Sequence, residues 1–161
     1  MSFVEAKGEE VGMWHGFCHS KLIRQSKKEK MYNREFTPEW IHRLEDNEVF
    51  VFGSNLGGFH GGGAARVALE KFGAVWGQGV GLQGQSYAIP TMHGGVEVIK
   101  PYVDEFISFA QEHRELKFLV TPIGCGIAGF TAEDMAPLFA NAIDVENVIL
   151  PESFVKVIQK S

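Results

Sequence analysis

The stretch Gly53–Gly73, "GSNLGGFHGGGAARVALEKFG", decides the fold that this sequence predicts. Six of its first eleven residues are glycine, and the remainder has the spacing of an amphipathic helix that ends at Gly73. The run "EVFVFG" (Glu48–Gly53) leads into it and is short, apolar and rich in aromatic residues, which indicates a buried strand. A strand, a glycine-rich loop and a helix are therefore expected in succession.

The alternation of strands and helices continues to the end of the chain. Strands that are apolar along their whole length are typical of a sheet covered by helices on both faces. We therefore predict a three-layer α/β/α domain with a mostly parallel central sheet. The expected strands span residues 48–53, 86–91, 116–121 and 147–151, and the expected helices span residues 37–46, 64–73, 100–113, 131–143 and 152 onward.

Start signals mark three of these helices. Thr37 is a suitable N-cap with Pro38 at the first helical position. Pro101 suits the first turn of the helix expected over 100–113, because that turn needs no backbone N–H from the proline. Thr131 is an N-cap with Asp134 three residues later.

Composition restricts the class of protein. A chain of 161 residues with 45% hydrophobic and 22% charged residues is typical of one soluble globular domain. The net charge of −5 argues against general nucleic-acid binding, which uses a basic face. No apolar run is long enough for a membrane span, no secretion signal is present, and two cysteines are too few for a disulfide framework. We therefore expect a cytoplasmic protein without membrane contacts.

Residues 1–30 differ from the rest of the chain. They show neither helical nor alternating periodicity, and they end in the basic run "KKEK". A peripheral or flexible extension is the expected structure, and the folded domain is expected over residues 31–161. The segment "HGFCHS" offers His15, Cys18 and His19, but a fourth ligand at a recognisable spacing is missing, so no metal site is predicted.

Two glycine-rich loops carry the functional signal. Gly53–Gly63 and Gly124–Gly129 each follow an expected strand and precede an expected helix. Ligands of α/β sheets bind beyond the carboxyl ends of the strands, and glycines before a helix leave backbone N–H groups open to an anion. Two such loops on neighbouring strands suit a diphosphate. The alternative is that the glycines serve tight turns alone.

Other glycine motifs fail on their context. "GVGLQG" (Gly79–Gly84) matches a dinucleotide-binding pattern, but an expected strand follows it where the motif needs a helix. "HGGG" (His60–Gly63) matches the oxyanion loop of esterases, but the chain has no G-x-S-x-G nucleophile elbow. A phosphate-binding G-x-x-x-x-G-K-[ST] loop is also missing. These patterns therefore predict neither a nicotinamide enzyme, nor an esterase, nor a nucleoside triphosphatase.

The two loops resemble those of the macro domain, the ADP-ribose-binding α/β module. "FGSNLGGFHGGGAA" and "TPIGCGIAGF" carry the likeness, which covers roughly residues 49–150; within the macro-like group, the chain resembles small bacterial and phage proteins. The resemblance implies ligand contacts and a role for each. Asn55 would approach the distal ribose, the loops would hold the diphosphate, and Phe130 would cover the sugar. The implied ligand-binding residues are Ser54, Asn55, Gly61, Gly62, Gly63, Gly124, Cys125, Gly126, Ile127, Ala128, Gly129 and Phe130.

Two departures from the family pattern bear on function. Hydrolytic macro domains usually have an aspartate two residues after the glycine run, where this chain has Ala65. The obvious carboxylate for activating water is therefore missing. The family's Gly-Asp-Ile segment, whose aspartate holds the adenine amino group, is also missing from residues 31–48. Asp46 is the nearest carboxylate there.

Several side chains near the loops have two interpretations each. Cys125 is either a small residue in a tight loop or, at a helix N-terminus, a thiol of lowered pKa. His60 and His93 are either ligand contacts or bases, or plain loop residues. The glutamines of "GQGVGLQGQS" could read sugar and base edges or serve loop backbone; they are Gln78, Gln83 and Gln85.

The sequence thus supports two functions. The first is a binding module for ADP-ribose or a related nucleotide diphosphate, free or attached to a macromolecule, with no cofactor. The second is a hydrolase that removes an ADP-ribosyl group or a terminal phosphate, with Asn55 and His60 placing the water. Ala65 favours the binding module.

Overall fold

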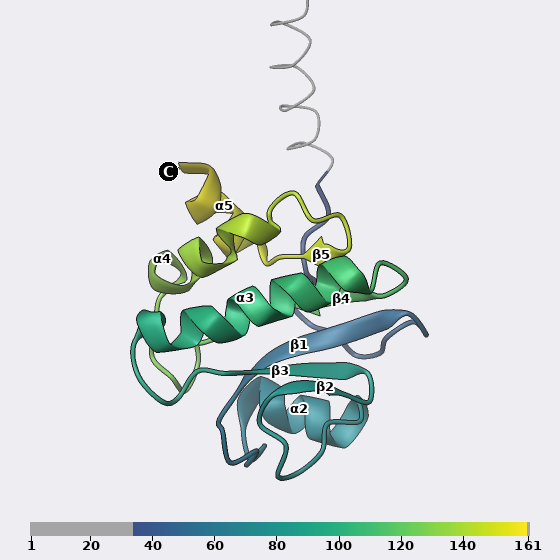
Figure 1. The fold of residues 1–161 in the computed structure, drawn as a ribbon. Helices are drawn as coiled ribbons and strands as arrows, with labels where there is room; N and C mark the ends of the chain where they lie inside the picture. Colours follow the sequence, from purple (N-terminus) through teal and green to yellow (C-terminus); the bar gives the residue numbers. More distant parts are fainter. Residues whose placement is uncertain (1–33, 161) are drawn as a thin grey trace, which may run out of the picture. The chain divides into compact units, whose positions relative to one another are not determined.

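The computed structural model describes residues 34–160, and its central element is a five-stranded sheet (Figure 1). The strand order is β2-β3-β1-β4-β5. The strands β1, β3, β4 and β5 run parallel, and β2 pairs antiparallel with β3. The strands are β1 (Glu48–Ser54), β2 (Gly81–Gln83), β3 (Ser86–Pro90), β4 (Lys117–Val120) and β5 (Val148–Ile149). The predicted α/β class with a mostly parallel sheet is confirmed.

Helices pack on both faces of the sheet. Figure 1 shows α3 lying along one face and α2 on the other. Helices α4 and α5 and the 3₁₀ helix η1 belong to the α3 side, where they share one hydrophobic cluster. The helices are α2 (Gly63–Lys71), α3 (Val96–Glu112), α4 (Ala132–Met135), η1 (Ala136–Ala142) and α5 (Glu152–Lys160).

Strand β1 belongs to both hydrophobic clusters because its side chains alternate. Val49 and Val51 pack with α3, while Phe50 and Phe52 pack with α2. All four are nearly inaccessible to solvent. A strand buried on both faces explains why "EVFVFG" is apolar without interruption.

The position of β1 between β3 and β4 determines where a ligand can bind. The chain passes from β1 through α2 to β3 on one side, and then through α3 to β4 on the other side of β1. The loops that leave β1 and β4 therefore diverge to helices on opposite faces. Such a switch point opens a crevice at the carboxyl ends of the strands.

The segment that contains "GVGLQG" forms a β-hairpin. Strand β2 turns through Gly84 and Gln85 into β3, and Gly84 has the positive φ of +59° that such a turn needs. The expected continuation as a strand is confirmed. The short antiparallel strand β2 was not predicted, because its three residues are too few to show alternation.

The helix expected over residues 37–46 is wrong, since this segment contains no helix. Thr37 does not cap a helix: its N–H donates to Leu150 O at 2.9 Å and its hydroxyl to Ile149 O at 2.9 Å. Trp40 is 75% exposed. Hydrogen bonds to a strand more than a hundred residues away therefore override the local start signal.

The remaining helices were predicted with errors at their ends. Helix α3 begins at Val96, so Pro101 lies inside the helix and not in its first turn. Thr131 and Asp134 form the predicted capping box of α4, but after Met135 the chain tightens into the 3₁₀ helix η1. None of the helices within residues 34–160 is long and apolar enough to span a membrane. Residues 1–30, including "HGFCHS", lie outside the described part of the chain.

Candidate functional site

A cleft of about 260 Å³ lies at the carboxyl ends of the parallel strands. The loops after β1, β3 and β4 all contribute to it, and Figure 1 shows these loops at the same end of the sheet. Both predicted glycine-rich loops therefore meet at one site. The lining residues are Gly53–Asn55, Phe59, Gly62–Ala65, Thr91, Met92, Thr121–Gly124 and Gly126–Ala128.

The floor of the cleft is close-packed around Gly53. A Cβ at this position would lie 3.3 Å from the Thr91 hydroxyl and 3.5 Å from Gly124 N. Thr121 also lines the cleft, and its hydroxyl donates to Val51 O at 2.7 Å. The ends of three strands thus converge on one glycine, and two threonines that the sequence reading did not single out lie beside it.

Side chains of the first loop are used to hold its own backbone. The Asn55 carboxamide accepts from Phe59 N–H at 2.9 Å and donates to Phe59 O at 3.0 Å. The buried Ser54 hydroxyl donates to Gly79 O. Asn55 lines the cleft, and its two hydrogen bonds give it a structural task in closing the loop.

The backbone of both loops offers unused hydrogen-bond donors to the cleft. Among the described residues, the lining N–H groups without a protein acceptor include eight at the entry to α2 and on the second loop. Backbone N–H groups in the first turn of a helix have no intrahelical partner, so they are open to a side chain, water or a ligand. These donors belong to Gly62, Gly63, Ala64, Ala65, Gly124, Gly126, Ile127 and Ala128.

The second loop reaches across the cleft toward the first. Gly124 and Gly129 have positive φ values of +79° and +80°, which turn the chain away from β4 and back toward α4. Ile127, at the tip, is 76% exposed, and its Cδ1 would lie 3.3 Å from a Cβ at Gly62. An apolar side chain therefore bridges the two rows of free N–H groups.

The cleft lining carries no charged side chain and no histidine or cysteine among the described residues. An anion held there would be bound by backbone dipoles and by the positive end of α2, not by lysine or arginine. No side chain of the lining has the chemistry of a general base at neutral pH.

His60 lies outside the cleft, in the core beneath the first loop. Its side chain is 0% exposed, its ring contacts Phe52 edge-on at 5.2 Å between centroids, and its Nε2 lies 3.2 Å from Gln83 Oε1. Its Nδ1 has no partner among the described residues. This position gives no support to the predicted catalytic role, because a substrate cannot reach a fully buried ring.

Cys125 and Phe130 also lie outside the cleft lining. Burial, followed by the negative charges of Asp134 and Glu133, raises the pKa of the Cys125 thiol. The alternative of a thiol with lowered pKa is therefore wrong. Phe130 packs on the main hydrophobic cluster, and its N–H donates to Gly124 O at 2.9 Å. The aromatic ring that does line the cleft is Phe59, which was not predicted.

The glutamines serve loop backbone. The side chain of Gln83, which is buried, accepts from Val75 N–H at 2.7 Å and donates to Gln78 O at 3.0 Å. Gln78 donates to Leu82 O at 3.0 Å, and Gln85 donates to Glu45 O at 2.9 Å. Of the two interpretations, the structural one holds for all three.

His93 joins two of the loops around the cleft. Its Nε2 accepts from Leu56 N–H at 2.7 Å, which ties the loop after β3 to the loop after β1. The side chain is exposed but does not line the cleft. Asp46 lies before β1, at the opposite end of the sheet, and so cannot read a ligand in this cleft.

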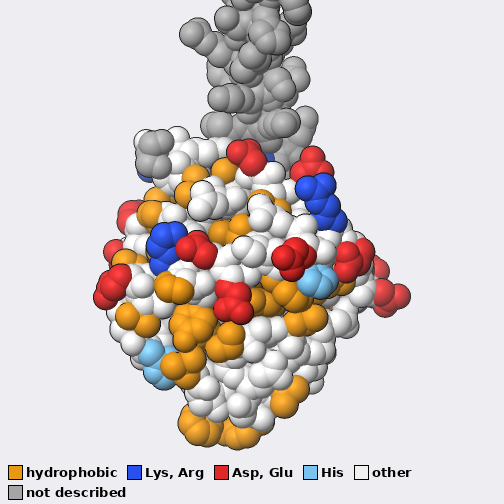
Figure 2. Space-filling view, viewed as in Figure 1, with side chains coloured by type: hydrophobic (Ala, Val, Ile, Leu, Met, Phe, Trp, Pro, Cys, Tyr) orange, Lys and Arg blue, Asp and Glu red, His pale blue; other side chains and the backbone are white. Residues whose placement is uncertain are grey.

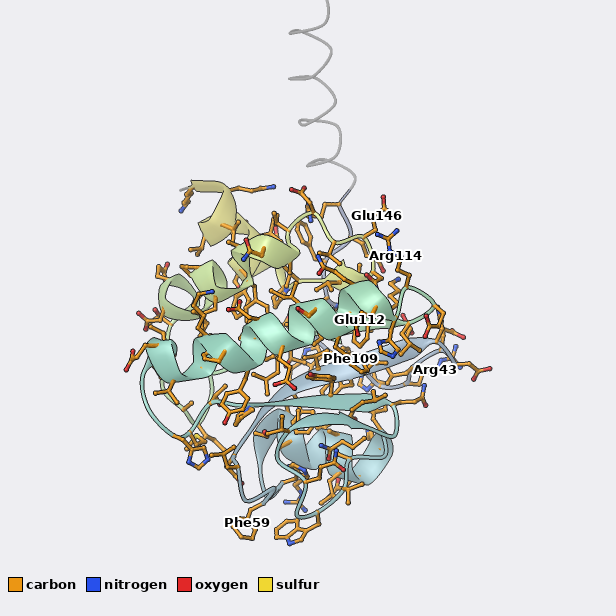
Figure 3. The ribbon with its side chains drawn as sticks, viewed as in Figure 1. Arg43, Phe59, Phe109, Glu112, Arg114 and Glu146 are labelled. Carbon is orange, nitrogen blue, oxygen red and sulfur yellow. The ribbon has the colours of Figure 1, made fainter. Side chains whose placement is uncertain are left out.

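A second hollow, of about 460 Å³, lies at the amino ends of β1, β4 and β5. Four of its lining side chains are charged: Arg114, Lys117, Asp144 and Glu146. Figure 3 labels Arg114 and Glu146 near the end of α3.

No family model, curated protein or solved structure matches the chain. The resemblance to macro domains therefore stays a prediction from the two loop motifs.

Proposed function

We propose that residues 36–160 form a three-layer, macro-like domain that binds ADP-ribose or a related nucleotide diphosphate in the carboxyl-end cleft. The observation that supports this most is that eight N–H groups without a protein acceptor, at the entry to α2 and on the second loop, belong to residues that line one cleft. A diphosphate has acceptor oxygens on two adjacent centres, so it can take donors from both loops at once. The same site could hold an ADP-ribosyl group attached to a macromolecule.

The composition of the lining favours binding without rapid hydrolysis. Ala65 lies in the first turn of α2 and lines the cleft where a hydrolytic relative would have its aspartate. Asn55 is bonded to Phe59, and His60 is in the core. Water activation by these residues would need a rearrangement of the first loop.

Isothermal titration calorimetry tests the proposal most directly. ADP-ribose, its cyclic isomers, NAD and AMP should be compared, with inorganic pyrophosphate as the probe of the diphosphate site alone. We expect ADP-ribose or one of the related diphosphates to bind and AMP to bind more weakly, because AMP has a single phosphate. The proposal fails when none of the diphosphates binds at concentrations up to about 1 mM, a standard free energy of about −4 kcal/mol.

Turnover separates the binding module from the hydrolase. ADP-ribose-1″-phosphate and a mono-ADP-ribosylated peptide should bind but release product slowly or not at all. Ala65→Asp places a carboxylate near the expected position of the ligand, and a general base there can raise a rate by about 10²–10⁴-fold. Fast release by the unmodified protein that disappears in Asn55→Ala would establish the hydrolase instead.

A further inference from the structure

Phe59 and Trp76 form an exposed aromatic pair at the cleft. Their ring centroids lie 5.6 Å apart with an interplanar angle of 59°. Phe59 is 61% exposed and Trp76 is 56% exposed. Figure 3 shows Phe59 pointing outward at the end of the loop after β1, and Figure 2 shows apolar surface at the same end of the molecule. Large aromatic side chains that stay exposed together on a folded surface usually mark an interaction site.

The pair is held in place from beneath. Both backbone polar groups of Phe59 are bonded to the Asn55 side chain, at 2.9 and 3.0 Å. Val75, next to Trp76, donates its N–H to the buried Gln83 side chain at 2.7 Å. The backbone that carries the rings is therefore preorganised, and binding a ligand there costs little ordering of the loops.

The two loops that carry the rings press directly against each other. Gly77 N–H donates to Gly58 O at 2.9 Å, and a Cβ at Gly58 would lie 2.3 Å from Gln78 N. Gly58 also has a positive φ of +70°. This position requires glycine, and the close approach it permits is what brings Phe59 and Trp76 together.

The pair is continuous with the proposed diphosphate site. Phe59 itself lines the cleft. It lies three residues before Gly62, whose N–H has no protein acceptor and which precedes the first turn of α2. A ligand whose phosphates lie on that loop can therefore extend onto the ring. A base inserted between the two rings would need them parallel and about 7 Å apart, twice the usual contact distance of ~3.5 Å. The rings are 5.6 Å apart and tilted by 59°, so a base can stack only on the outer face of the pair.

We propose that the Phe59–Trp76 pair stacks the nucleobase, or another planar ring, of the nucleotide bound in the cleft; this rests on the proposed function. The described cleft lining has no free carboxylate or amide to read base edges, since Asn55 is bonded to Phe59. The aromatic rings would contact the flat face of the base, and such stacking accepts any base because every base has a π-face.

Calorimetry on variants tests the stacking. Phe59→Ala and Trp76→Ala should each weaken ADP-ribose binding by about 5- to 160-fold, the range of a base–aromatic stack removed by alanine substitution. Phe59→Tyr keeps the ring and should retain the affinity. Pyrophosphate binding should change less than about twofold in all three variants. Leu82→Ala removes an exposed apolar side chain that does not line the cleft, so it is the matched control.

Fluorescence gives an independent readout. In a Trp14→Phe/Trp40→Phe background, Trp76 is the remaining tryptophan, and ADP-ribose should quench it whereas pyrophosphate should not. Binding of ADP-ribose with neither quenching nor an effect of Phe59→Ala would overturn the stacking surface and leave the proposed function standing. Absence of binding by every diphosphate would overturn both. Equal losses for ADP-ribose and pyrophosphate in Phe59→Ala would show a collapsed loop and would also overturn the stacking proposal.

Discussion

The two ends of the sheet each carry a hollow, and the smaller one is the better candidate site. The amino-end hollow has about 460 Å³ and four charged lining side chains, while the carboxyl-end cleft has about 260 Å³ and none among the described residues. In the larger hollow, Asn147 donates to the carbonyls of Ala110, His113 and Leu116 at 2.8, 3.1 and 3.1 Å. In the smaller one, eight described backbone donors at the entry to α2 and on the second loop have no protein acceptor.

This difference shows that volume and charge do not select the site. Asn147 satisfies the end of α3 and the start of β4, so the amino-end hollow is shaped by interactions that hold the fold. The unpaired donors of the carboxyl-end cleft have no such task. Backbone donors gathered at the start of a helix are the better indicator of an anion site, because they can bind a ligand without breaking a bond that holds the fold.

The largest expected effect comes from obstructing the cleft. Gly126→Glu adds bulk and negative charge beside the unpaired donors, and Gly62→Val adds a branched side chain where a phosphate approaches. Each should weaken ADP-ribose binding at least 100-fold, about 2.7 kcal/mol, in calorimetry. Both should fold, because a Cβ at Gly126 meets nothing within 4 Å and a Cβ at Gly62 meets Ile127 Cδ1 alone.

Controls at other positions make that test specific. Ala140→Glu adds the same carboxylate at an exposed residue of η1, and Arg114→Glu reverses a charge in the amino-end hollow. Both should bind ADP-ribose normally. If Arg114→Glu abolishes binding while Gly126→Glu does not, the roles of the two hollows are reversed.

The second prediction tests the structural role of the amino-end hollow. Asn147→Ala removes donors to three carbonyls and should lower the free energy of unfolding by about 1–3 kcal/mol, with an unchanged ADP-ribose dissociation constant. Chemical denaturation measures the first and calorimetry the second. Asn141→Ala, at an exposed position, is the control and should do neither. A loss of affinity in folded Asn147→Ala would count against the division of tasks between the two ends.

The third prediction concerns discrimination between bases. ADP-ribose and its inosine and guanosine analogues should bind within about tenfold of each other, or 1.4 kcal/mol, because the described lining of the carboxyl-end cleft has no free carboxylate or carboxamide for base edges. Competition calorimetry measures this ratio. A preference for adenine of a hundredfold or more would show that another residue hydrogen-bonds to the base edge. Gln83 is buried and Asp46 lies at the opposite end of the sheet, so both are poor candidates for this role.

A fourth, several-fold effect reports the electrostatics of the second loop. The pKa of Cys125 is raised by burial and by Asp134 and Glu133, so its thiolate forms at higher pH than in the unfolded chain. In a Cys18→Ser background, iodoacetamide should therefore react with Cys125 more slowly in the folded protein at pH 7, and the difference should shrink as pH rises past the raised pKa. Faster alkylation than in the unfolded chain at pH 7 would indicate a cationic cleft.

The smallest expected effect is that of salt. Because the described lining of the cleft has no charged side chain, screening should change the ADP-ribose dissociation constant by less than about threefold between roughly 50 and 500 mM NaCl. Binding should be slightly tighter at high salt, because salt screens the repulsion between the chain's net charge of −5 and the anionic ligand. Marked weakening by salt would point to lysine or arginine contacts, as the amino-end hollow would provide.

The sequence predicted the parts of the cleft that local patterns encode. A strand, a glycine-rich loop and a helix in direct succession imply a site at a strand's carboxyl end, and both loops were found there. What failed depended on distant contacts. Thr37 stands in the sequence context of a helix N-cap, but its hydroxyl donates to Ile149 of β5. His60 and Gln83 are buried beside each other by the folded chain, which the local sequence does not show. Phe59 lies within the stretch Gly53–Gly73, but its exposure depends on the folded structure and cannot be deduced from the sequence.

The pairing of Thr37 with β5 has a consequence for self-association. Strand β5 is the edge of the sheet, and an open edge offers carbonyls to a strand of another molecule. Thr37 takes the carbonyls of Ile149 and Leu150 with its hydroxyl and its N–H. Two carbonyls at the end of this edge are therefore unavailable to a strand of another molecule. The segment between Thr37 and β1, which lost its predicted helix, thus begins with a residue that shields the end of β5 from such pairing.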